Sequence, residues 1–204
     1  MTEAEWLASD VSYQPLIYAR EVASVRKLRL VAAAYARWLQ TLPHYQADAK
    51  PCADLIERVA DAPAPWRQLE GELYARPGGW QLSHTLGPED RVGQNLNKMV
   101  WFAEQEFEAR NEDTQIAHVQ VRALLHEVVG NPFHPVAIDP AWRTEAVVDL
   151  ARTVYEYRAF DWLPLLADAL EDAGCADAAV LAHCRGPGSH VRGCWVVDLV
   201  LGTR

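Results

Sequence analysis

Cysteine and histidine gather in one short stretch near the C-terminus. Five such residues fall within 20 positions of one another, namely Cys175, His183, Cys184, His190 and Cys194. Thiolate sulfur and imidazole nitrogen are the preferred protein ligands of zinc. The stretch is therefore a candidate zinc site, with Cys175, Cys184, His190 and Cys194 as its candidate ligands.

The spacing of these residues favours packing over metal binding. A zinc signature pairs its ligands as C-x₂₋₄-C and H-x₃₋₅-H, and neither pair is present. The neighbours His183 and Cys184 would point in different directions on a helix, and His190 and Cys194 share one helical face in a predicted helix over residues 189–201. Because cysteine behaves as a small buried apolar residue, we expect core packing here, no bound metal and no cofactor, with zinc as the alternative.

Two further histidines lie on a predicted long helix. His118 and His126 are eight residues apart, about 12 Å along a helix axis, which is too far for two ligands of one ion. We expect both at the surface or at a helix end. The chain also lacks G-x-S-x-G, G-x-x-x-x-G-K-[ST] and G-x-G-x-x-G, so no catalytic residue is predicted and an enzyme is the less favoured class.

A tryptophan-bearing loop is the third candidate site. Residues 63–90 contain Trp66 and Trp80 and the Gly78-Gly79 pair, which is typical of a chain reversal. Tryptophan anchors many protein interfaces because it buries a large area at low entropic cost. Core packing of short helices also explains many tryptophans. The sharper prediction is that this loop binds a protein partner whose identity the sequence does not reveal.

Composition and charge limit the function classes. Hydrophobic residues make up 50% of the 204 residues and the formal net charge is −9, so the chain is globular and lacks the basic surface that nucleic-acid binding requires. No signal-peptide pattern and no membrane-length apolar run is present. We therefore expect a cytoplasmic protein with its cysteines as thiols, without membrane or nucleic-acid partners.

The hydrophobic period is helical almost throughout. We predict an all-α chain, an orthogonal or solenoid-like array of short helices with one irregular loop region. The predicted helices cover residues 3–8, 15–23, 24–42, 54–62, 66–74, 91–129 as one long helix or as two broken near 111–114, 144–158, 162–173, 177–184 and 189–201. Ser24 and Asp161 are expected to cap the helices that follow them, and Trp195 and Leu199 of the last helix are expected to be buried. Residues 131–142 form an extended connector because three prolines prevent a helix. We expect a single domain over residues 1–204, with a subdivision into residues 1–62, 63–90 and 91–204.

The second half of the chain resembles a known family. The segments NPFHPVAIDPAW, ARTVYEYRAFDWLPLLADALEDAGC and LAHCRGPGSHVRGCWVVDLVLG resemble the C-terminal region of a large paralogous family of uncharacterised bacterial proteins carried by planctomycete genomes. The start, MTEAEWLASD and SVRKLRL, is similar too, although AAAYARWL stands where that family has cysteines. The resemblance implies no activity and no site residue. The predicted function is a protein-interaction or accessory module, and the alternative is a small zinc-supported domain or an enzyme that uses the C-terminal cluster.

Overall fold

Helix is the only regular secondary structure among the residues that the computed structural model describes. These are residues 1–8, 13–42, 49–61, 71–72, 75 and 92–203. The predicted all-α class is confirmed. The chain divides into two compact units, Met1–Val129 and Gly130–Arg204, a boundary that the composition did not suggest. No helix in the described ranges combines the length and the apolar character needed to cross a bilayer.

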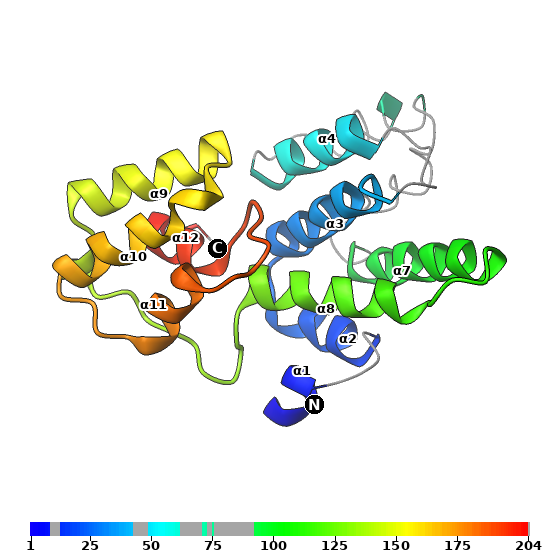
Figure 1. Ribbon diagram of the computed structural model, residues 1–204, viewed down its shortest axis with the longest axis horizontal. Coiled ribbons are helices and arrows are strands. Elements are labelled where there is room, and N and C mark those ends of the chain that lie inside the picture. The colour runs from blue at the N-terminus through cyan, green and yellow to red at the C-terminus, as the bar shows by residue number, and fades with distance from the viewer. Residues whose placement is uncertain (9–12, 43–48, 62–70, 73–74, 76–91, 204) are drawn as a thin grey trace. The chain divides into compact units, whose positions relative to one another are not determined.

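The N-terminal unit is built around one central helix. Its described helices are α1 (Glu3–Ala8), α2 (Tyr13–Val22), α3 (Val25–Leu39), α4 (Ala49–Asp61), α7 (Val92–Ala109) and α8 (Gln115–Val129). The central helix α3 packs against α4, α7 and α8 (Figure 1). Its alanines are small enough for neighbours to approach closely, and Ala32, Ala33 and Ala36 are fully buried. Ser24 caps α3 as predicted, since its side chain accepts a hydrogen bond from the Lys27 backbone N–H.

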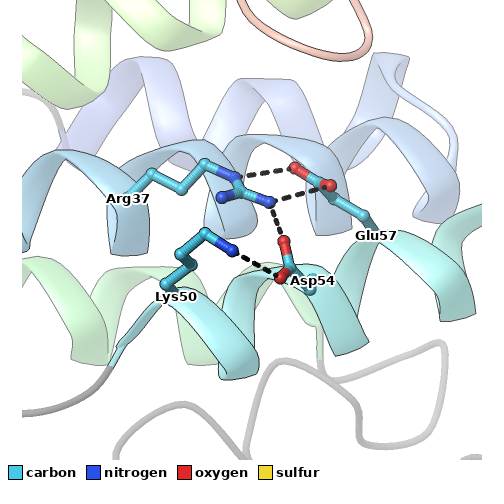
Figure 2. Close-up of polar contacts among 4 residues, drawn as sticks. All are labelled: Arg37, Lys50, Asp54 and Glu57. Carbon is cyan, nitrogen blue, oxygen red and sulfur yellow. Dashed lines mark hydrogen bonds and ion pairs between the residues drawn. The ribbon is translucent and has the colours of Figure 1, made fainter. Parts of the chain in front are cut away.

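Four charged residues connect α3 to α4 (Figure 2). The Arg37 guanidinium donates from Nε to Glu57 Oε1 at 3.1 Å and from Nη2 to Glu57 Oε2 at 3.2 Å, and it also bonds Asp54. Lys50 lies 3.5 Å from the other Asp54 oxygen. The Glu57 side chain is only 4% exposed, so its charge depends on the bidentate contact with Arg37.

Of the two possibilities for residues 91–129, one long helix or two broken helices, the structure has two, α7 and α8. The chain leaves α7 through Asn111, which has a positive φ of 57°, a conformation that asparagine tolerates better than most residues. Asp113 then accepts a hydrogen bond from the Gln115 backbone N–H at 2.9 Å, which satisfies a free donor at the start of α8. The two helices pack against each other.

The C-terminal unit has its own apolar core. Its helices are α9 (Glu145–Tyr157), α10 (Leu163–Asp172), α11 (Ala178–Arg185) and α12 (Trp195–Leu201), with short 3₁₀ helices at Pro140–Trp142 and Phe160–Trp162. Helix α9 packs on α10 and α12, and α10 packs on α11. Thr144 and Asp177 cap α9 and α11 through their side chains. Asp161 does not cap α10 as expected, because Trp162 holds the cap position without a side-chain bond.

The last helix is shorter than the sequence predicts. A helix over residues 189–201 was expected, but α12 begins only at Trp195. The reason is glycine: Gly186 ends α11 in an extended conformation, and Gly193 has a φ of 94°, outside the helical range. Residues 186–194 therefore form a loop. Trp195 and Leu199, expected to be buried, are only partly buried, whereas Val196, Val197 and Val200 fill the core.

Candidate metal centre

Two histidines and one cysteine of the C-terminal unit converge on one point. One ligand atom from each of His183, His190 and Cys194 lies within 4.8 Å of the others. His183 Nε2 is 3.1 Å from Cys194 Sγ, and the rings of His183 and His190 have centroids 5.1 Å apart.

Each side chain of this His183–His190–Cys194 cluster comes from a different local structure. His183 lies in the last turn of α11, His190 lies in the loop, and Cys194 is the residue that precedes α12. The loop begins at Gly186, where a Cβ would stand only 3.1 Å from the Ala182 carbonyl oxygen. The absence of a side chain at Gly186 therefore lets the chain turn sharply and carry His190 back to His183.

Neighbouring contacts hold the elements that carry the ligands. Arg185, at the end of α11, donates to Asp168 at 2.7 Å and to Glu171 at 2.6 Å, both on α10. At the other side of the loop, the Cys194 backbone N–H donates to the Val191 carbonyl at 3.0 Å. The turn that presents Cys194 is thus closed by its own backbone, and α11 is tied to α10.

The cluster is buried on its sulfur side and partly exposed on its imidazole side. Cys194 has no exposed surface, whereas His183 and His190 are partly exposed. The Trp195 ring lies 5.1 Å from the His183 ring. Trp195 in turn packs on Gly130, where a Cβ would lie 3.2 Å from Trp195 Cγ. The indole therefore supports His183 from the side of the core.

The geometry is close to that of a zinc site. Zinc bonds of about 2.0–2.1 Å to nitrogen and about 2.3 Å to sulfur place tetrahedral ligand atoms about 3.3–3.7 Å apart. The separation of 3.1 Å between His183 Nε2 and Cys194 Sγ is near that range. Each of the other two donor pairs lies within 4.8 Å, so it must close by at most about 1.5 Å to reach that range. Two imidazole nitrogens and one thiolate form a donor set that suits zinc and cobalt(II).

The structure separates the predicted ligands into two groups. It brings His190 and Cys194 together, but Cys175 and Cys184 lie in the apolar core of the unit and outside the cluster. The expected ligand set left out His183, because adjacent helical residues such as His183 and Cys184 cannot both face one ion. In the structure the Cys184 side chain points into the core, and the His183 side chain therefore faces the loop. All four cysteines of the chain are free thiols.

His118 and His126 lie near opposite ends of α8, and His118 is buried. His118 is 6% exposed and pairs with Glu104, which also accepts a hydrogen bond from the Tyr13 hydroxyl at 2.6 Å. His118 lies in the first turn of α8, one of the two positions expected for it, but it is not at the surface, because this carboxylate partner makes its burial tolerable. His126 does lie in the last turn of α8, but its Nε2 is 3.0 Å from the Trp6 carbonyl oxygen, and burial lowers its pKa although that hydrogen bond opposes the shift.

Glu104 also lines a polar surface pocket of about 450 Å³. The other lining residues are Gln105, Glu108, Asn111, Glu112 and Thr114. Both carboxylate oxygens of Glu104 are already engaged with Tyr13 and His118. The Tyr13–Glu104–His118 contacts therefore join α2, α7 and α8, which is a structural role.

The predicted partner-binding residues, Trp66, Gly78, Gly79 and Trp80, lie outside the described residues. The same holds for most of the predicted helix over residues 66–74. A partner-binding role for this loop stays a prediction.

Comparison with known proteins adds no relative. No protein-family model matches the chain, and searches of curated proteins and of solved structures found no match. The resemblance to the planctomycete family therefore stays a prediction as well.

Proposed function

We propose that this chain is a zinc-binding helical protein whose C-terminal unit is stabilised by an ion held between His183, His190 and Cys194. The observation that carries the proposal is the convergence of these three donor atoms within 4.8 Å. Packing alone explains a buried cysteine, but it does not explain why two partly exposed imidazoles turn toward its sulfur.

The position of the cluster gives such an ion a structural effect. Helix α11 packs on α10, and α12 packs on α9. An ion bound by His183 of α11 and Cys194 at the start of α12 would connect these two pairs of helices. Because an ion of this kind binds the folded arrangement far better than the unfolded chain, its binding free energy adds to folding stability. A cytoplasmic location, as the sequence predicts, would keep Cys194 reduced and able to bind.

Metal analysis of the full-length protein, purified without an affinity tag that binds metal, tests the proposal. We expect close to one zinc per chain in the native protein, and a loss of most of it in His183→Ala and Cys194→Ser. The matched controls are His134→Ala, an exposed histidine of the same unit, and Cys184→Ala, a buried cysteine outside the cluster. Both controls should retain the metal.

Cobalt(II) provides a second measurement that does not depend on how well the variants fold. Cobalt bound to the wild-type protein should give tetrahedral d–d bands and a sulfur-to-cobalt charge-transfer band in the near ultraviolet. A protein that is folded by circular dichroism, carries no zinc and takes up no cobalt would overturn the proposal.

A protein-interaction role is the second candidate, and exposed aromatic residues favour it. Tyr157 is 77% exposed, Trp162 is 44% exposed and Leu165 is 53% exposed, all near the junction of α9 and α10. Aromatic residues of this kind dominate many binding interfaces. A partner that co-purifies with the wild-type chain should not co-purify with the double variant Tyr157→Ser/Trp162→Ser. It should still co-purify with Trp101→Ser, which changes an exposed tryptophan of the other unit. Equal recovery from both variants would remove this candidate.

A further inference from the structure

The junction of α9 and α10 exposes two aromatic side chains and one large apolar side chain. Tyr157 ends α9, Trp162 ends the 3₁₀ helix Phe160–Trp162, and Leu165 lies in the first turn of α10. That 3₁₀ helix packs on both α9 and α10, so the three side chains belong to one part of the unit, which we call the α9–α10 corner. No hydrogen bond or ring contact among the described residues engages Tyr157 or Trp162.

Carboxylates flank the α9–α10 corner. Glu156 and Asp161 each come directly before one of the two aromatic residues, and Asp168 lies three residues beyond the exposed leucine, on the same face of α10. All three carboxylate side chains are exposed. The sequence from position 156 to position 172 contains five acidic residues and a single basic one, Arg158. The corner therefore combines apolar surface with negative charge.

Two of these carboxylates have no counter-ion in the part of the chain that the structure describes. Asp168 shares the Arg185 guanidinium with Glu171. By contrast, no ion pair or hydrogen bond among the described residues engages Glu156 or Asp161. Uncompensated charges of one sign create a negative surface potential, which attracts cationic groups and repels nucleic acid and anionic lipid.

Aromatic rings beside carboxylates favour arginine and lysine as binding partners. A guanidinium or ammonium group over the face of a ring is attracted by the ring quadrupole, and a nearby carboxylate adds an ion pair. The C-terminal unit already contains one contact of the first kind, because the Arg192 guanidinium lies 4.5 Å from the centroid of the Tyr155 ring. Leu165 adds apolar surface for a further side chain.

We propose, as an extension of the protein-interaction role considered above, that the α9–α10 corner binds a basic segment of another protein, in which arginine or lysine lies beside apolar residues. The cationic groups of that segment contact the two aromatic rings and the unpaired carboxylates of Glu156 and Asp161. Its apolar side chains pack on Leu165.

Peptide selection on the full-length protein tests this inference without a known partner. Random short peptides displayed on phage are selected on the wild-type chain, and those that also bind Tyr157→Ser/Trp162→Ser are removed. We expect the remaining peptides to carry a net positive charge together with leucine or aromatic residues. Their affinities, measured by fluorescence anisotropy, should fall about threefold to tenfold in Glu156→Gln/Asp161→Asn, since each exposed ion pair contributes modestly. Added salt should weaken binding to the wild type as well.

Glu145→Gln/Asp149→Asn is the matched control. It removes the same charge from exposed positions of the same unit. Asp149 is eight residues from Tyr157, about 12 Å along the axis of α9, and Glu145 is farther away. This variant should bind the selected peptides like the wild type, and circular dichroism verifies that each variant is folded.

The outcomes separate this inference from the interaction role on which it rests. If the selected peptides are neutral or acidic, or if Glu156→Gln/Asp161→Asn binds them as the wild type does, the corner binds a partner of another kind. The inference is then wrong while the interaction role stands. If light scattering shows a dimer of the wild type that Tyr157→Ser/Trp162→Ser does not form, the occupant is a second copy of this chain and the inference is again wrong. If no peptide depends on the two rings, the inference fails, and co-purification of a partner alone decides the interaction role.

Discussion

His183 Nε2 lies 3.1 Å from Cys194 Sγ, although the two residues are eleven positions apart in the chain. The contact is made because α11 ends at Gly186 and α12 begins only after Gly193, so the intervening loop can fold back. Continuous helix between the two residues would have separated them by about 16 Å. The candidate site therefore exists because a predicted helical segment is not helical.

Metal removal should lower the stability of the protein. At a free zinc concentration of 100 times the dissociation constant, binding contributes about 2.7 kcal/mol. For a chain of this size, removal of the ion should lower Tm by about 5–10 °C. Calorimetry with and without a zinc chelator measures the difference, and Cys194→Ser serves as the control because its Tm should not respond to the chelator. An unchanged Tm for zinc-loaded wild-type protein would contradict a stabilising role for the ion.

Replacing Arg37 should destabilise the N-terminal unit. Arg37→Ala leaves the buried Glu57 carboxylate without its bidentate partner, and breaking such a pair costs about 3 kcal/mol or more. Lys50→Ala should cost less than about 0.5 kcal/mol, because the Lys50 side chain is 68% exposed and its ion pair is screened by water. Urea denaturation of both variants measures the difference. Similar urea midpoints for the two variants would show that other groups stabilise the Glu57 carboxylate when Arg37 is removed.

The pKa of His126 predicts a loss of stability in acid. Burial lowers this pKa below the ordinary value of 6.5, so the unfolded chain takes up a proton at a higher pH than the folded chain does. Stability is therefore fully present above about pH 6.5 and declines as the pH falls through the folded-state pKa, at most about 1.4 kcal/mol per pH unit.

His126→Gln isolates this contribution. Glutamine does not titrate, and its amide can still donate to the Trp6 carbonyl. The free energy of unfolding of this variant should fall less steeply between pH 7 and pH 5 than that of the wild type. Parallel profiles would mean that His126 does not control the response.

Two glycine variants should separate backbone strain from crowding of Trp195. Gly130 and Gly174 both have positive φ, at 76° and 88°, and alanine in this conformation costs about 1 kcal/mol. At Gly174 nothing lies within 4 Å of an added Cβ, whereas at Gly130 the Trp195 ring lies 3.2 Å away. Gly130→Ala should therefore be the more destabilising by about 1 kcal/mol or more. An equal loss of stability in the two variants, measured by thermal unfolding, would show that the Trp195 ring can move away from the added methyl group without loss of packing energy.

The sequence predicts most of the helices and misses the geometry of the site. Periodicity and caps identify α3, α9 and α11, because Ser24, Thr144 and Asp177 act locally on their own helices. The site depends instead on where a helix stops. The apolar pattern around Val196 suggests a longer helix, and only the positive φ of Gly193 and the extended Gly186 break it. The burial of His118 was missed for a related reason, since its partner Glu104 comes from another helix.

The three proposed ligands occupy a segment of only twelve residues, from His183 to Cys194. The entropy lost when such a short loop closes is small, so an ion could bind this segment before the longer-range packing of α9 on α12 is established. Metal capture would then act as a local kinetic step that organises α11 and α12, and the supply of zinc would influence how fast the C-terminal unit folds as well as how stable it becomes.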